Sequence, residues 1–357
     1  MQSKKYDFID FLRGIAILLV FINHIPRYED ILFSDLNIYQ QYFFLIGTYG
    51  VQLFYIVSAF TLLASLSAYN EINYFNFFLR RIFRIVPIFF LGIFFYSFYL
   101  DHGPTDPMNV VLNLLFLNNI IPPSNDLIPG GSTISTEMNF YMILPLMFIL
   151  INNYKKTLIS IFFIIFILFI LNLFFEHFFY DKYFGEANFY RTIFTQIFVF
   201  LLGFLAFYIN KDFLGEELNK KKIIKIVFYS LPIFIFIILI FALGRREQEF
   251  FYFRNFMIIS IFLFLLFNFI FIFSKILRKN FIFKIVKNIG KVSFSMYVWH
   301  WVVLGHVWNH YFLKMENFNG KMILFIFSSL IATYFISFIS YQVEKFFISI
   351  GKKITTK

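Results

Sequence analysis

Long apolar runs alternate with short polar segments along the whole chain. Runs of about 20 apolar residues have the length that an α-helix needs to cross the hydrocarbon core of a membrane. The pattern predicts an all-α, polytopic integral membrane protein with about ten transmembrane helices in one membrane-embedded domain, 1–357. The predicted spans are 8–26, 42–67, 85–101, 136–152, 157–176, 190–210, 223–243, 251–273, 292–312 and 322–346.

Composition and charge support this class and predict an orientation. Of the 357 residues, 60% are hydrophobic and 14% are charged, which no ordinary soluble domain matches. With a cytoplasmic N-terminus, 23 of the 31 Lys and Arg residues fall on the cytoplasmic side, so the positive-inside rule predicts that both termini are cytoplasmic. This distribution explains most of the net charge of +11, so we expect no nucleic-acid partner. Cysteine is absent, which excludes a cysteine nucleophile.

The first predicted span carries four polar residues, Asp10, Arg13, Asn23 and His24. Ionisable groups inside a membrane are expensive, so they usually face a protein interior or a watery cavity. Arg13 and His24 lie eleven residues apart, on one helix face and about 16 Å apart along the axis. Asp10 lies one turn from Arg13 on much the same face. His24 is therefore either a packing histidine bonded to a neighbouring helix or a general base in a buried cavity.

Three arginines, Arg80, Arg81 and Arg84, precede the third predicted span. They fit the positive-inside pattern of a cytoplasmic anchor. However, Arg81 and Arg84 lie one helical turn apart, so both can point at one anion, and guanidinium groups bind phosphate in a bidentate manner. The second interpretation is a cytoplasmic site for a phosphate-bearing cofactor.

Glu137 follows the longest predicted outer loop, about 102–135, at the outer start of the fourth span. An acid in this position either stabilises the helix start or orients an imidazole or activates a hydroxyl. By the predicted topology, Glu137 and His24 both lie toward the outer half of the membrane, so the two can meet.

The ninth predicted span places Ser293, Tyr297 and His300 on one helix face. This polar stripe is either packing glue or part of a cavity wall. His306 and His310 have the spacing of a metal-ligand pair, but no carboxylate motif accompanies them, so we predict no metal site.

Five segments of the chain together resemble the membrane acyltransferase family 3. In order, they are 9–16 followed by His24, 50–60, 81–87, 129–141 and 293–300. Three positions depart from the family pattern, since Ala59 replaces a glycine, Ser132 a tryptophan and Thr133 a serine. The change at Ser132 concerns the shape of the acceptor-side loop rather than the residues of the chemistry.

The resemblance implies transfer of an acyl group, usually acetyl, from cytoplasmic acyl-CoA to a hydroxyl of an extracytoplasmic glycan or lipid-linked saccharide. Acyl-CoA is then a donor substrate, with no tightly bound cofactor, and the protein lies in the lipid bilayer of a bacterial cytoplasmic membrane. By this likeness His24 is the catalytic base and Glu137 lies near it. The alternative function is a multi-pass transporter or flippase for a small anion or a lipid-linked sugar.

The resemblance and the polar pattern together define the remaining candidate residues. The donor-binding candidates are Arg13, Arg80, Arg81 and Arg84. The candidates for the substrate site or cavity wall are Asp10, Asn23, Ser58, Tyr141, Tyr297 and His300.

Overall fold

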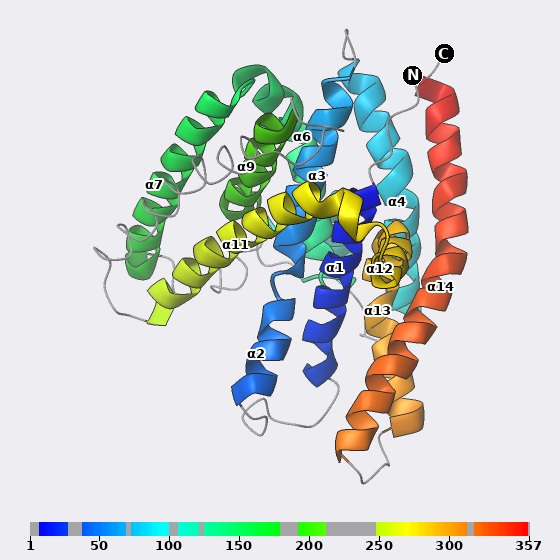
Figure 1. The fold of residues 1–357 in the computed structure, drawn as a ribbon. Helices are drawn as coiled ribbons and strands as arrows, with labels where there is room; N and C mark the ends of the chain where they lie inside the picture. The colour runs from blue at the N-terminus through cyan, green and yellow to red at the C-terminus, as the bar shows by residue number, and fades with distance from the viewer. Residues whose placement is uncertain are drawn as a thin grey trace.

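The computed structural model describes residues 7–27, 38–68, 73–99, 106–120, 125–178, 192–211, 248–312 and 318–355. Within these ranges the regular structure is helical and contains no strand (Figure 1). The helices are α1 (Asp7–His24), α2 (Ile38–Gly47), α3 (Gly50–Leu66), α4 (Tyr74–Tyr99), α5 (Pro107–Leu114), α6 (Gly131–Leu150), α7 (Tyr154–Phe178), α9 (Ile193–Asn210), α11 (Gln248–Leu277), α12 (Phe281–Lys291), α13 (Ser293–Val307) and α14 (Phe318–Thr355). The prediction of an all-α protein is confirmed.

Five of the described helices, α6, α7, α9, α11 and α14, are long and apolar enough to cross a membrane. They support a polytopic membrane protein, whereas the number of ten crossings is not confirmed. The predicted seventh span, 223–243, lies outside the described residues.

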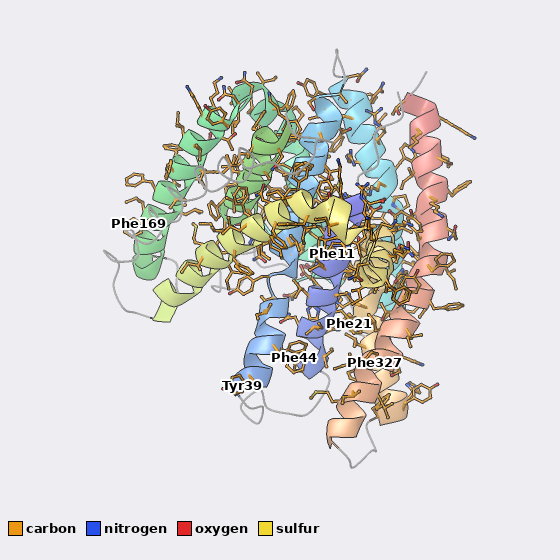
Figure 2. All side chains as sticks on the ribbon, viewed as in Figure 1. Phe11, Phe21, Tyr39, Phe44, Phe169 and Phe327 are labelled. Atoms are coloured by element: carbon orange, nitrogen blue, oxygen red, sulfur yellow. The ribbon has the colours of Figure 1, made fainter. Side chains whose placement is uncertain are left out.

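The apolar side chains lie both between the helices and on the outer surface of the bundle (Figure 2). Helix α9 lies in the interior, with 89% of its apolar stretch buried, whereas the corresponding fraction is 22% for α7 and for α14. Phe327 on α14 and Tyr39 on α2 are exposed (Figure 2). Apolar residues on the outside of the bundle are typical of a surface that faces lipid.

The prediction of one continuous span over 42–67 is wrong, because the chain breaks between α2 and α3. The glycines that flank the break pack against the backbone of α1. A Cβ atom on Gly47 would lie 2.3 Å from the Leu19 carbonyl oxygen, and one on Gly50 would lie 2.5 Å from the Ala16 carbonyl oxygen. The break therefore lies where α1 is so close that a residue with a Cβ atom would overlap its backbone. A hydropathy pattern contains no information about such a contact.

Helix α4 begins at Tyr74, eleven residues before the predicted span 85–101. The apolar-run criterion excluded the three arginines, but the helix includes them and continues through Pro87. With 26 residues, α4 is about 39 Å long. The arginines are therefore part of a long helix rather than of a cytoplasmic loop.

The short helix α12 crosses α1 at very close range. A Cβ atom on Gly290 would lie 1.6 Å from the Asp10 carbonyl oxygen, and one on Gly14 would lie 2.0 Å from the Val286 carbonyl oxygen. This contact fixes the part of α1 that carries Asp10 and Arg13.

We expect Gly290→Ala to destabilise the protein, because the added methyl group overlaps the α1 backbone. Overpacking of this kind costs about 1–3 kcal/mol. The measurement is the melting temperature in detergent, compared with Gly131→Ala, whose added Cβ would lie 3.7 Å from its nearest neighbour. Equal melting temperatures for the two variants would contradict the close contact between α1 and α12.

Candidate active site

A cavity lies between α1, α3, α4, α6 and α13, and polar side chains make up much of its wall. Its lining residues are Arg13, Phe54, Tyr55, Ser58, Arg84, Ile85, Thr133, Ile134, Glu137, Tyr141, Ser293, Phe294 and Tyr297. Six of them are candidates from the sequence: Arg13, Ser58, Arg84, Glu137, Tyr141 and Tyr297. All five segments of the sequence pattern, although far apart along the chain, therefore contribute to one cavity.

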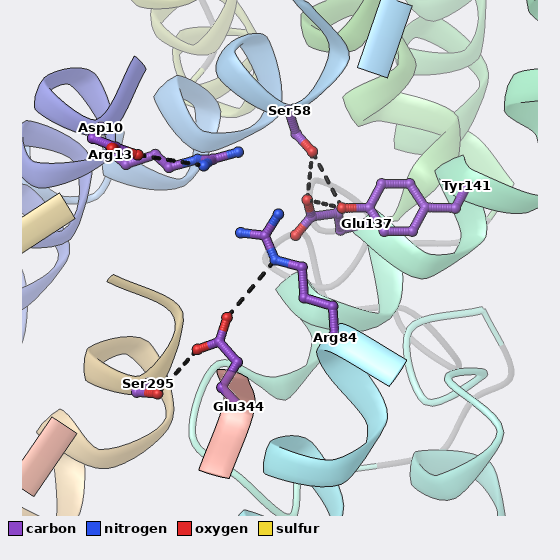
Figure 3. A network of polar contacts seen from close by, with 8 residues as sticks. All are labelled: Asp10, Arg13, Ser58, Arg84, Glu137, Tyr141, Ser295 and Glu344. Atoms are coloured by element: carbon purple, nitrogen blue, oxygen red, sulfur yellow. Dashed lines mark hydrogen bonds and ion pairs between the residues drawn. The ribbon is translucent and has the colours of Figure 1, made fainter. Parts of the chain in front are cut away.

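Three polar side chains meet on one wall of the cavity (Figure 3). The Ser58 hydroxyl donates a hydrogen bond of 2.5 Å to Oε1 of Glu137, and the Tyr141 hydroxyl donates to the same oxygen. The two hydroxyl oxygens of Ser58 and Tyr141 lie 3.3 Å apart. Two donors on one oxygen suit an ionised carboxylate, which is a strong hydrogen-bond acceptor. Glu137 is therefore held in place from both α3 and its own helix.

Two arginines reach the cavity, each with a carboxylate partner (Figure 3). Nη1 of Arg13 lies 3.9 Å from Oδ1 of Asp10, one turn earlier on α1. Nε of Arg84 lies 3.8 Å from Oε1 of Glu344 on α14, and Ser295 Oγ donates to the other oxygen of Glu344 over 3.3 Å. Because this pair uses Nε of Arg84, the two terminal nitrogens carry four further N–H donors.

The expectation that the paired arginines and Glu137 lie at opposite faces of the membrane is wrong, because Arg84 and Glu137 line the same cavity. Arg84 follows the start of α4 by ten residues, or about 15 Å of helix. Glu137 follows the start of α6 by six residues, or about 9 Å. Both side chains therefore lie within the length of their helices rather than at the ends.

The other two arginines of this segment lie outside the cavity wall. Arg80 donates from Nη1 to the Thr355 hydroxyl over 3.3 Å, so it ties α4 to the end of α14. The Arg81 guanidinium lies over the rings of Phe77 and Tyr141, at 5.2 and 6.0 Å from the ring centroids. Arg81 thus packs against Tyr141, which lines the cavity.

A pair of histidines lies beside the cavity. Nδ1 of His24 and Nε2 of His300 are 3.0 Å apart, which joins the last residue of α1 to α13. The His24 ring also packs against Trp301 at 4.9 Å between centroids. His300 is fully buried, whereas His24 is half-buried.

Tyr297 connects the histidine pair with the cavity. Its ring lines the cavity and lies 5.7 Å from the His300 ring. Its hydroxyl donates to the Gly130 carbonyl over 3.0 Å, and Gly130 has a positive φ of 80°. A Cβ atom at Gly130 would lie 2.6 Å from the Tyr297 hydroxyl, so both the backbone angle and the contact favour glycine. Glu137 accepts hydrogen bonds from Ser58 and Tyr141, and the ring of Tyr297 makes the contact between the cavity and the histidine pair.

Asn23, a candidate for the cavity wall, has a different position. Its Oδ1 accepts a hydrogen bond of 2.9 Å from the Thr48 hydroxyl, in the break between α2 and α3. Asn23 is not among the cavity-lining residues. This contact supports a structural role for Asn23, since it ties α1 to the helix break.

The loop before α6 is fixed by bonds between side chains. Asp126 accepts from Asn118 over 2.7 Å and from Ser132 over 2.9 Å. Ser135 in turn donates to Asn118 over 2.5 Å. Ser132, one of the residues that depart from the family pattern, is therefore part of a polar network that ties Asn118 and Asp126 to the start of α6.

Sequence reasoning missed Glu344, which is only 3% exposed and is the partner of Arg84. The signal was present, because an acid near the end of an otherwise apolar span is a functional candidate by default. The signal was overlooked because Glu344 and the adjacent Lys345 together resemble the charged end of an ordinary helix.

The fold and the cavity define a helical membrane protein with a buried, charged site. Residues 6–342 match the family model of the acyltransferase domain, acyltransferase family 3. Because this match covers most of the 357 residues, the chain belongs to that family and is an acyltransferase. No curated protein and no solved structure matches the chain. The resemblance of the five sequence segments is thereby confirmed, and the transporter alternative has no support from the family.

Proposed function

We propose that this protein is an integral-membrane O-acyltransferase. It transfers an acyl group, most simply acetyl, from cytoplasmic acyl-CoA to a hydroxyl of an extracytoplasmic glycan or lipid-linked saccharide. The observation that carries the proposal is one buried cavity that holds Arg13, Arg84 and Glu137 and adjoins the pair of His24 and His300 through Tyr297. Such a site combines anion-binding groups with a base.

The two cavity arginines suit a phosphate-bearing donor. Their side chains are 17% and 30% exposed for Arg13 and Arg84, so a ligand in the cavity can reach them. Guanidinium groups present several N–H donors in a planar fork that matches phosphate oxygens. Asp10 and Glu344 balance the two charges while no anion is bound and hold the arginines in position.

The position of His24 along α1 suits the reach of the donor. Arg13 and His24 are eleven residues apart, which is about 16 Å along the helix. Acyl-CoA carries its thioester at the end of a long flexible arm, so the phosphates and the reacting carbonyl need separate binding groups. We therefore assign the phosphate contacts to the arginines and the reacting end to the region of His24.

The reaction balances with one base. His24 accepts the proton of the acceptor hydroxyl as its oxygen attacks the thioester carbonyl carbon. The new C–O bond forms, the C–S bond breaks, and the proton passes from His24 to the thiolate of CoA. The products are an O-acyl ester and CoA with a free thiol, and His24 returns to its neutral form.

Glu137 supports this chemistry from the cavity wall. Its carboxylate fixes the hydroxyl groups of Ser58 and Tyr141 and adds a negative charge beside the two arginines. This negative charge offsets the repulsion between the two positively charged arginines in the cavity. We assign Glu137 a positioning role rather than that of the base.

The orientation follows from the distribution of basic residues. The positive-inside pattern favours cytoplasmic termini, which places the start of α1 on the donor side and His24 toward the acceptor side. We propose the bacterial cytoplasmic membrane as the location.

The test uses inverted membrane vesicles that contain the protein and the host glycans. Acetyl-CoA is supplied with the label either in its acetyl group or in its CoA moiety. We expect the acetyl label alone to appear in the glycan fraction and to be released by mild alkali, as an O-ester is. No transfer, or a label that resists alkali, would overturn the proposal. Uptake of label without covalent transfer would indicate a transporter.

A further inference from the structure

We propose that His300 is a positioning residue that determines which nitrogen of His24 carries the proton, so that Nε2 of His24 is the basic atom. The proposal rests on the proposed function of His24. It assigns to α13 the part that a carboxylate plays behind the histidine of other acyl-transfer sites.

The bonds of His300 fix its own proton. Its Nδ1 lies 2.8 Å from the Tyr297 carbonyl oxygen and 3.2 Å from the Met296 carbonyl oxygen. Carbonyl oxygens only accept hydrogen bonds, so Nδ1 carries the hydrogen. A neutral imidazole has a single N–H, so Nε2 of His300 is then an acceptor. Because His300 has an exposed fraction of 0%, the neutral ring is favoured over a charged one.

The proton position of His24 follows from that of His300. Nε2 of His300 lies 3.0 Å from Nδ1 of His24, and one of the two nitrogens has to donate. Since Nε2 of His300 accepts, Nδ1 of His24 carries the hydrogen and its Nε2 carries the lone pair. This is the tautomer that free histidine in water populates less, so the protein selects it.

The same bonds prepare His24 to accept a proton. When Nε2 of His24 takes a proton, the ring becomes positive, and its Nδ1–H bond to His300 becomes charge-assisted. His300 passes the polarisation on to the carbonyl groups of Met296 and Tyr297, so the chain of bonds stabilises the cation without a second charge inside the membrane. A neutral partner is suited to an apolar span, where an additional carboxylate would be expensive.

The exposure of the two histidine side chains agrees with these roles. His24 is half-buried and therefore accessible from one side, whereas His300 behind it is fully buried. Tyr297 supplies one of the carbonyl acceptors and also bonds to Gly130 through its hydroxyl, so the register of α13 against the loop before α6 is fixed at this point. A histidine that only packed against a neighbouring helix would not need both the hydrogen bond to the Tyr297 carbonyl and the fixed register of α13.

The test is nitrogen NMR of the full chain in lipid nanodiscs, with ¹⁵N-labelled histidine. His24→Gln identifies the His24 signals by their loss. We expect wild-type His24 to be protonated at Nδ1. His300→Gln should keep this state, because its amide oxygen can accept at the position of Nε2, and His300→Met, of similar shape, should lose it. Protonation of His24 at Nε2 in the wild type would overturn the inference, as would an unchanged tautomer in His300→Met.

A kinetic measurement separates this inference from the proposed function. For His300→Met we expect acyl transfer to fall about 10- to 100-fold in kcat with little change in KM for the donor, as is usual for partners that orient a reacting group. His300→Gln should recover most of the loss. An inactive wild type with the expected tautomer would contradict only the proposed function. An active wild type with the other tautomer would contradict only the role of His300.

Discussion

His24→Ala is expected to lower acyl transfer by at least about 100-fold, because a positioned base contributes about 10²- to 10⁴-fold to such reactions. The bundle should remain folded, since His24 is the last residue of α1 and is half-buried. Donor binding should also be retained, because the cavity arginines are unchanged. The measurement is the transfer rate of labelled acetyl groups beside the binding affinity for acetyl-CoA.

His310→Ala is the matched control for this variant. His310 is an exposed histidine whose Nδ1 lies 3.0 Å from the backbone oxygen of His306, in the turn that extends α13. The His310→Ala variant should transfer acetyl groups at the wild-type rate. Retained transfer by the His24 variant would show that His24 is a packing residue, and lost donor binding would show that the substitution disturbs the cavity.

Helix periodicity was sufficient to place part of the site. Arg13 faces a buried cavity, as the polar stripe on the first span indicated. His24 meets His300, a residue that the sequence had placed on a polar stripe of another span. Both predictions rest on the fixed angle per residue of an α-helix, which a single sequence contains in full.

The positions of the polar residues along their helices, and the contacts between helices, could not be predicted in the same way. The break between α2 and α3 results from contact of Gly47 and Gly50 with α1, so it depends on a neighbour far along the chain. The meeting of Arg84 and Glu137 depends on where α4 and α6 begin, and apolar runs do not report a helix that continues through charged residues. Glu344 is recognised only once its partner on α4 is known.

Arg84→Ala is expected to weaken acetyl-CoA binding by about 10- to 100-fold, because a hydrogen bond to a charged group contributes about 1.5–3 kcal/mol. The control is Arg278→Ala. Arg278 lies on the cytoplasmic side by the basic-residue pattern and pairs with Asp7 over 4.0 Å, and Lys287 keeps Asp7 paired over 3.6 Å when the arginine is removed. This control should bind acetyl-CoA as the wild type does. Equal affinity in both variants would mean that Arg84 is only a structural partner of Glu344.

A double variant separates lost donor contacts from a disturbed fold. Arg84→Ala alone leaves the buried carboxylate of Glu344 without its cation, and an unbalanced buried charge destabilises a protein by several kcal/mol. Adding Glu344→Gln removes that charge and keeps the side-chain volume. If Arg84 binds the donor phosphates, the double variant folds well and still binds acetyl-CoA weakly, whereas Glu344→Gln alone binds at least as tightly as the wild type. Restored binding in the double variant would instead assign the whole effect to the ion pair, and the phosphate contacts would then have to come from Arg13.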